Sequence, residues 1–166
     1  MLPRPTPDTP GPGQESVWDY PRPPRLEEFN GSITVELGGE AIASTQRAWR
    51  VLETSHPPTY YLPRDCFRDG ALRPTAGSSW CERKGQASYF DVLGGTKTAA
   101  RAAWTYVHPT HGFSAIAGAV AVMAALVDRC TVNGEVVQPQ PGGFYGGWVT
   151  SWVVGPFKGA PGSQGW

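Results

Sequence analysis

The sequence predicts a mainly β fold, and three observations support this prediction. Short apolar runs alternate with polar residues at the two-residue period of a half-buried strand. Glycine and proline pairs separate these runs, and Asn133-Gly134, the preferred centre of a type I′ hairpin turn, joins two of them. With 40% hydrophobic and 11% aromatic residues, the 166-residue chain can fill the core of one domain.

The expected strands follow one another along the chain. Residues 32–37 and 40–45 alternate in polarity around Gly38-Gly39, which predicts a hairpin. A strand at residues 47–53 is expected to continue this hairpin, and further strands are expected at 89–93, 103–107, 131–132, 135–137 and 148–154. Residues 115–127 have apolar residues at helical spacing, but they are equally consistent with a buried strand followed by a turn. We favour the strand and the turn.

Glycine and proline are concentrated at the two ends of the chain. Residues 1–24 hold eight of the 17 prolines, and residues 138–166 hold eight of the 21 glycines. Proline-rich segments adopt extended conformations without a packed core. We therefore expect a disordered Pro-rich tail at 1–15, an extended aromatic and Pro-rich arm at 16–30, a single β domain at 31–137, and a Gly-rich aromatic arm packed on that domain at 138–166.

The composition excludes several classes of protein. The 14 Lys and Arg residues balance the 14 Asp and Glu residues, which argues against a protein that binds nucleic acid through bulk charge. Three cysteines without a tight spacing do not predict a secreted disulfide scaffold. No signal peptide is evident, and the longest apolar run, at 115–127, is too short to cross a bilayer. We expect a cytoplasmic protein that binds neither nucleic acid nor membrane.

A first candidate for chemistry is the segment 53–66. Its three prolines stiffen a loop that displays two carboxylates, an imidazole, two phenols and a thiol. Loops held by a sheet often carry binding or catalytic residues. The alternative interpretation is that the prolines form a rigid connector and the tyrosines only pack.

A second candidate is the segment 78–85, which contains Cys81 and Lys84. A cysteine close to cationic side chains can have a lowered pKa and act as a nucleophile, although a lone cysteine is more often a small buried hydrophobic residue. A zinc knuckle would need a second cysteine where Lys84 stands. No metal or other cofactor is therefore expected, and no phosphate-binding glycine motif occurs.

An ordered set of segments resembles the DUF427 family. The segments are Arg47 with Val51-Leu52-Glu53-Thr54, Tyr60-Tyr61-Leu62-Pro63-Arg64-Asp65, Leu72-Arg73-Pro74-Thr75, residues 81–92, and Ala103-Trp104-Thr105-Tyr106. The resemblance runs from about residue 31 to 137, and the arms resemble those of longer, actinobacterial-type members. It implies a fold similar to the β-tent group, in which two β-sheets meet at an angle, with short helical turns and irregular arms.

The resemblance also suggests that the matched polar and aromatic residues line one pocket. Three of them are candidate catalytic residues: Glu53 as an acid or base, Cys81 as a nucleophile, and Lys84 as an amine or acid. The candidate ligand-binding residues are Arg47, Tyr60, Asp65, Tyr89, Trp104 and Tyr106. An alternative is that Glu53 forms a buried ion pair with Arg47 or Lys84 inside an aromatic core.

We therefore expect a polar and aromatic pocket that binds an unidentified small molecule, with catalysis as an open extension. The alternative is a non-catalytic interaction module in which the two arms engage another chain, for example in a homodimer, because tryptophan and tyrosine favour interfaces. The resemblance does not assign a reaction, since fold alone does not imply function.

Overall fold

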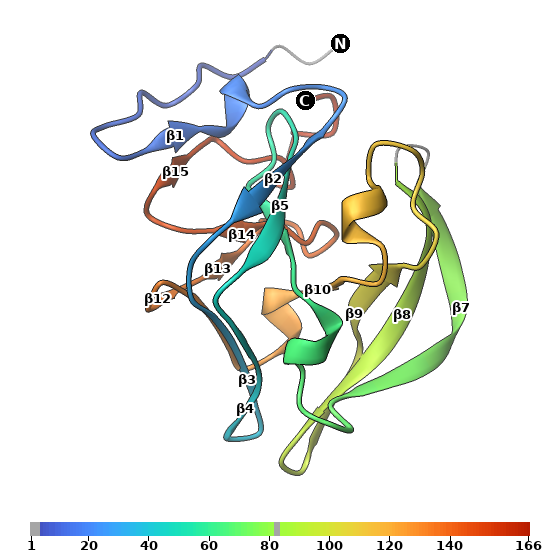
Figure 1. Ribbon diagram of the computed structural model, residues 1–166. Coiled ribbons are helices and arrows are strands. Elements are labelled where there is room, and N and C mark those ends of the chain that lie inside the picture. The colour runs from blue at the N-terminus through green and yellow to red at the C-terminus, as the bar shows by residue number, and fades with distance from the viewer. Residues whose placement is uncertain (1–3, 82–83) are drawn as a thin grey trace.

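The computed structural model of the chain describes residues 4–81 and 84–166, without the side chain of Cys81. It confirms the mainly β prediction, and its helical segments are single 3-10 turns (Figure 1). The strands are β1 (Glu15–Ser16), β2 (Arg25–Phe29), β3 (Ile33–Leu37), β4 (Glu40–Thr45), β5 (Ala48–Leu52), β6 (Thr59–Tyr61), β7 (Leu72–Cys81), β8 (Gly85–Gly94), β9 (Lys97–Tyr106), β10 (Val120–Val122), β11 (Arg129–Val132), β12 (Glu135–Val136), β13 (Gln138–Pro139), β14 (Trp148–Val149) and β15 (Val153–Val154). The 3-10 turns are η1 (Val17–Asp19), η2 (Arg64–Cys66), η3 (Ser114–Ile116) and η4 (Ala124–Leu126). None of the described helical segments has the length and apolar character needed to cross a membrane.

Two four-stranded antiparallel sheets dominate the described structure. Their strand orders are β10-β9-β8-β7 and β12-β11-β3-β4. A three-stranded sheet, β2-β5-β6, is joined to the first of them because Leu62 and Val120 exchange two backbone hydrogen bonds of 2.8 Å. The pairs β1-β15 and β13-β14 are formed by the arms. The larger sheets correspond in number to the two that the family resemblance implied, and the three smaller sheets are additions.

The two hairpins expected from turn chemistry are confirmed. Strands β3 and β4 pair around Gly38 and Gly39, which both have positive φ angles, of 63° and 80°. Strands β11 and β12 pair around Asn133 and Gly134, with φ angles of 50° and 81°. Positive φ at both central positions is the requirement of a type I′ turn, and Asn-Gly meets it at little cost.

The β3–β4 and β8–β9 hairpin tips touch each other, which brings the two large sheets together at one end of the molecule (Figure 1). Gly38 lies so close to the carbonyl of Gly94 that a Cβ atom at Gly38 would collide with it. Asp128 links the same region, since its carboxylate accepts from the Gly38 N–H at 2.8 Å and from Lys97 Nζ at 2.9 Å.

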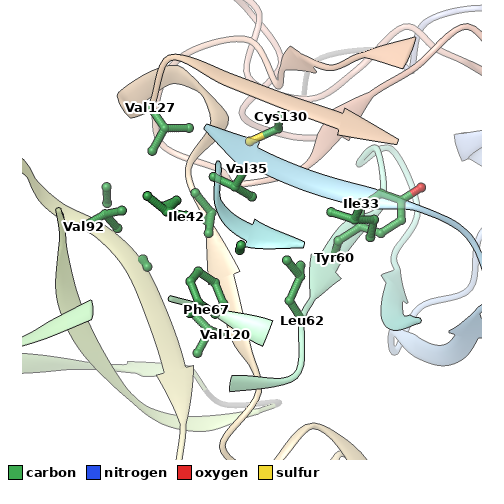
Figure 2. Packing of buried hydrophobic residues seen from close by; sticks show 14 of the residues in the cluster. Ile33, Val35, Ile42, Tyr60, Leu62, Phe67, Val92, Val120, Val127 and Cys130 are labelled. Carbon is green, nitrogen blue, oxygen red and sulfur yellow. The ribbon is translucent and has the colours of Figure 1, made fainter. Parts of the chain in front are cut away.

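The main core fills the space between the two large sheets (Figure 2). Ile33, Val35 and Ile42 come from one sheet, and Val92 and Val120 from the other; each is fully buried. Burial of such side chains contributes about 1.5–3 kcal/mol apiece. The core therefore covers one face of the β7–β9 sheet, and the other face is available to form a site.

Strand membership differs from the sequence-based expectation in several places, and strands β6 and β7 were not expected. Strand β5, within the expected 47–53 strand, pairs with β2 and β6 instead of continuing the β3–β4 hairpin. The partner strand β2 lies inside the segment 16–30, which was expected to be an arm. Residues 148–154 form two short strands instead of one, because a turn at Thr150–Trp152 interrupts them.

The ambiguous segment 115–127 contains no long helix. It includes the end of η3, the three-residue strand β10 and the turn η4. All three residues of β10 are buried, because its two faces are both covered, and this explains the absence of strand alternation in the sequence. The preferred interpretation, a buried strand followed by a turn, describes residues 120–126.

The two arms pack on each other and on the domain. Strand β1 pairs with β15, and the Trp18 indole N–H donates to the carbonyl of Pro156 at 3.0 Å. Val17 is fully buried, and Arg50 of β5 forms ion pairs with Glu15 at 2.7 Å and with Glu27 at 2.6 Å. The aromatic part of the first arm is therefore held by the domain.

Candidate functional site

A cavity of about 670 Å³ lies on the face of the β7–β9 sheet that points away from the main core. This volume is within the range typical of small-molecule sites. The walls come from four parts of the chain: the sheet, the segment 51–61, the region around η4, and the C-terminal arm. The lining residues are Val51, Glu53, His56, Pro57, Thr59, Tyr61, Ser79, Trp80, Lys84, Tyr89, Arg101, Trp104, Tyr106, Met123, Leu126, Gln140, Phe144, Tyr145, Gly146 and Lys158.

Strand register explains the aromatic floor of the cavity. Tyr89 pairs with Trp104 across β8 and β9, and Ala87 pairs with Tyr106 two positions along. Because directly opposed residues share a face and residues two apart along a strand point the same way, these side chains lie together. Phe90, one position from Tyr89, is buried in the main core on the opposite face.

An irregularity between β8 and β9 brings Arg101 to the same cavity. Arg101 has a φ angle of 51°, and its backbone N–H donates to Asp91 Oδ1 at 2.9 Å. Its guanidinium lies 4.3 Å from the centre of the Tyr89 ring and donates to the carbonyl of Ala76 at 3.0 Å. Bulges of this kind redirect a side chain without changing the strand order.

The loop between β5 and β6 supplies Glu53 and His56. Burial lowers the pKa of His56 from 6.5 to about 4; Glu53 opposes this shift, while Lys158, Arg22 and Lys84 add to it. The His56 imidazole is therefore neutral at physiological pH. It also packs edge-on against Tyr145, with 4.8 Å between ring centres.

The C-terminal arm closes the cavity from the opposite side. Gln140 holds His56 through a 3.0 Å contact between Nε2 and the imidazole Nδ1. Gly146 lies directly against the Trp104 ring, where a Cβ atom would collide with it. Lys158 lies over the Tyr145 ring at 5.7 Å and donates to the backbone oxygen of Trp166 at 3.2 Å.

Five of the expected site residues line this cavity together: Glu53, Lys84, Tyr89, Trp104 and Tyr106. They come from β5–β6, the β7–β8 turn, β8 and β9, so the fold assembles residues up to 53 positions apart in sequence. The Cys81 side chain lies outside the described residues.

The other expected residues lie elsewhere. Tyr60 is in the main core with 1% of its surface exposed, where burial raises its pKa to about 12, and its neighbour Tyr61 lines the cavity instead. Alternation along β6 explains this difference of one position. Arg47 and Asp65 line a second cavity of about 750 Å³, next to Arg64.

Several lining residues were not among the expected ones. His56 belongs to the loop that the sequence singled out, but nothing in the sequence distinguished it from its neighbours. Gln140, Tyr145 and Lys158 belong to the C-terminal arm, and Arg101 depends on a bulge. The aromatic character of the arm predicted burial, but it did not indicate which face of the domain the arm would cover.

The thiols that the structure describes are poor nucleophiles. Burial raises the pKa of Cys66 to about 11, with the Asp65 charge as a further cause, and burial raises the pKa of Cys130 to about 12. Within residues 4–81 and 84–166, no three His, Cys, Asp or Glu side chains are grouped in a way that could hold a metal ion.

The model of a domain of unknown function, DUF427, matches residues 25–133 of the 166. The chain belongs to the DUF427 family. The DUF427 region includes β2 and the loop that carries Glu53 and His56, and it ends in the β11–β12 turn. The arm that supplies Gln140, Tyr145 and Lys158 follows that region. No curated protein matches the sequence.

Proposed function

We propose that this DUF427 protein binds a small organic molecule in the cavity over the β7–β9 sheet. The observation that supports this proposal best is the convergence of Glu53, Lys84, Trp104 and Tyr145 from four separate segments on one cavity. An aromatic wall with a few placed polar groups is the usual composition of a small-molecule site.

Polar side chains in the cavity are available for a ligand. Neither the Arg47–Glu53 nor the Lys84–Glu53 ion pair is present among the described residues, whose ion pairs lie elsewhere. Glu53 and Lys84 are both partly buried, so a ligand can contact them in a site that is shielded from bulk water. Catalysis by Glu53, Lys84 or Cys81 stays a prediction.

The packing of the arms favours this proposal over an interaction module. Trp148 has 1% of its surface exposed and stacks on Tyr60 with 5.1 Å between ring centres. Residues committed to the protein's own core are not available to a partner. Trp80 and Phe144 are 70% and 82% exposed, but both line the cavity, where they can cover a ligand.

A fragment screen by ligand-observed NMR tests the proposal. We expect the screen to find fragments that bind the wild-type full chain. These fragments should not bind the Trp104→Leu and Lys84→Met variants, but they should still bind Lys97→Met. Lys97 is the matched control, because it lies at the β8–β9 hairpin tip in an exposed pair with Asp128. A screen without hits, or hits that bind the two cavity variants as well as the wild type, would contradict the proposal.

A further inference from the structure

We infer that the ligand is a planar aromatic anion. Its anionic group would lie against Lys84, Lys158 and the N–H of His56, and its ring would lie among the aromatic side chains of the same cavity. This inference rests on the proposed function and specifies the chemical class of ligand.

The charges around the cavity favour an anion. Among the described lining residues, Lys84, Arg101 and Lys158 carry positive charge and Glu53 carries the one negative charge. The same lysines act electrostatically on His56. In a partly enclosed site, a net positive charge of this kind attracts anions more strongly than it would in open solvent.

Hydrogen bonds around Gln140 determine which nitrogen of His56 carries the proton. The backbone N–H of Gly147 donates to Gln140 Oε1 at 3.0 Å, which fixes the orientation of the amide. Gln140 Nε2 is then the donor, both to the carbonyl of Lys158 at 2.9 Å and to His56 Nδ1 at 3.0 Å. Because Nδ1 accepts, a neutral His56 must carry its proton on Nε2.

The Nε2–H of His56 is available to the cavity. Within the part of the chain that the structure describes, it has no hydrogen-bond partner. It is also not fully buried, unlike Ser55 Oγ, which is a fully buried side-chain atom without a partner. A neutral N–H donor beside two lysines suits an oxyanion, since the donor adds a directed hydrogen bond without a charge that would have to be desolvated.

The aromatic side chains favour a flat ring. The Trp104 indole N–H donates to the Tyr61 hydroxyl at 3.2 Å, and the two rings meet edge-on with 6.5 Å between centres. Tyr145 is held between His56 and Lys158. Rings fixed by such contacts present rigid faces and edges, which favour another planar ring.

Four probes with related carbon skeletons test the inference by isothermal titration calorimetry at neutral pH on the full chain. They are 2-naphthoate, 2-naphthyl phosphate, the neutral 2-naphthamide, and decalin-2-carboxylate, which has a saturated ring. We expect at least one of the naphthyl anions to bind about tenfold or more tightly than the amide, because a charge-assisted hydrogen bond is worth at least that factor. The decalin acid is expected to bind more weakly than 2-naphthoate.

Variants assign the effect to the site. Lys158→Met and Lys84→Met should each reduce the preference for the anion over the amide, and Lys97→Met should leave it unchanged. The relative affinities of 2-naphthoate and 2-naphthyl phosphate identify the preferred anionic group. Tighter binding of either one supports the inference.

Other outcomes overturn the inference. Equal binding of acid and amide, lost in Trp104→Leu, would overturn it and leave the proposed function standing. A saturated acid that binds as well as 2-naphthoate, or a preference that Lys84→Met and Lys158→Met do not alter, would also overturn it. Failure of all four probes to bind would overturn it too, and the proposed function would then be judged by the fragment screen alone.

Discussion

His56 owes its chemical state to residues far away in the sequence. It is partly buried in the cavity wall, it accepts from Gln140 of the C-terminal arm, and Lys158 of the same arm adds to the lowering of its pKa. The arm thus sets the tautomer, and contributes to the neutral charge state, of a side chain that belongs to the DUF427 region.

Gln140→Glu should reverse this state. A carboxylate at position 140 cannot donate to Nδ1, so the proton should move to Nδ1 and the pKa of His56 should rise from about 4. Two-dimensional ¹⁵N NMR of the imidazole measures both quantities directly. An Nδ1–H tautomer in the wild type at neutral pH would contradict the assignment.

The lowered pKa of His56 also predicts how stability depends on pH. The unfolded chain takes up a proton on His56 near pH 6.5, and the folded chain does so only near pH 4. The free energy of unfolding should therefore decrease as the pH falls through this window. Urea denaturation should show a smaller decrease in His56→Asn, and identical pH profiles for the two proteins would count against a neutral, partly buried imidazole.

Cysteine labelling separates the described thiols from Cys81. Since burial raises the pKa of Cys66 and Cys130, both should react slowly with iodoacetamide at pH 7. If Cys81 is a nucleophile, mass spectrometry of a partly labelled sample should find the modification there first. Labelling of Cys81 at the rate of the other two would remove it as a catalytic candidate.

At the scale of elements, local patterns were sufficient where neighbouring strands pair. Alternation and turn chemistry predicted the β3–β4 and β11–β12 hairpins, because everything that stabilises them lies within a few residues. They were insufficient for β5, whose partners β2 and β6 come from two different segments. They were also insufficient for Tyr60 and Tyr61, because a shift of one position on β6 exchanges the core face for the cavity face.

The N-terminal arm should divide into a dispensable and an essential part. Deletion of residues 1–7 should change stability by no more than about 0.5 kcal/mol, because the described part of this segment is mostly exposed. Deletion of residues 1–20 should cost at least ~3 kcal/mol, since it removes buried Val17 and Tyr20 and the Glu15 partner of Arg50. Denaturant unfolding measures both, and a stable 21–166 chain would show that the arm is not part of the fold.

The C-terminal arm is tested by one residue. Trp148→Ala should destabilise the protein by ~3–5 kcal/mol, because the side chain is fully buried, stacks on Tyr60 and donates to the carbonyl of Val122 at 3.0 Å. Val149→Ala in the same strand is a milder control, since that residue is only half-buried. Equal losses in the two variants would mean that the arm is not anchored by Trp148.

At the scale of the whole molecule, the candidate site joins the DUF427 region to the arm that follows it. The glycine and proline content distinguished the two ends of the chain from its middle. The aromatic residues of the C-terminal arm predicted that this arm packs on the domain. The position of Gln140 opposite His56, and of Gly146 against Trp104, depends on the path of the arm across the domain. No local pattern encodes that path, so the sequence predicted only five of the 20 described residues that line the cavity.

The most direct test of a site for aromatic anions over the β7–β9 sheet is a crystal structure of the full chain soaked with 2-naphthoate. The proposals predict electron density for the naphthyl ring among Tyr61, Trp104 and Tyr145, with the carboxylate within hydrogen-bond distance of His56 Nε2 and of at least one lysine, Lys84 or Lys158. Density for 2-naphthoate only outside this cavity, or a cavity occupied by water alone at a saturating concentration, would contradict the inference that this site binds a planar aromatic anion.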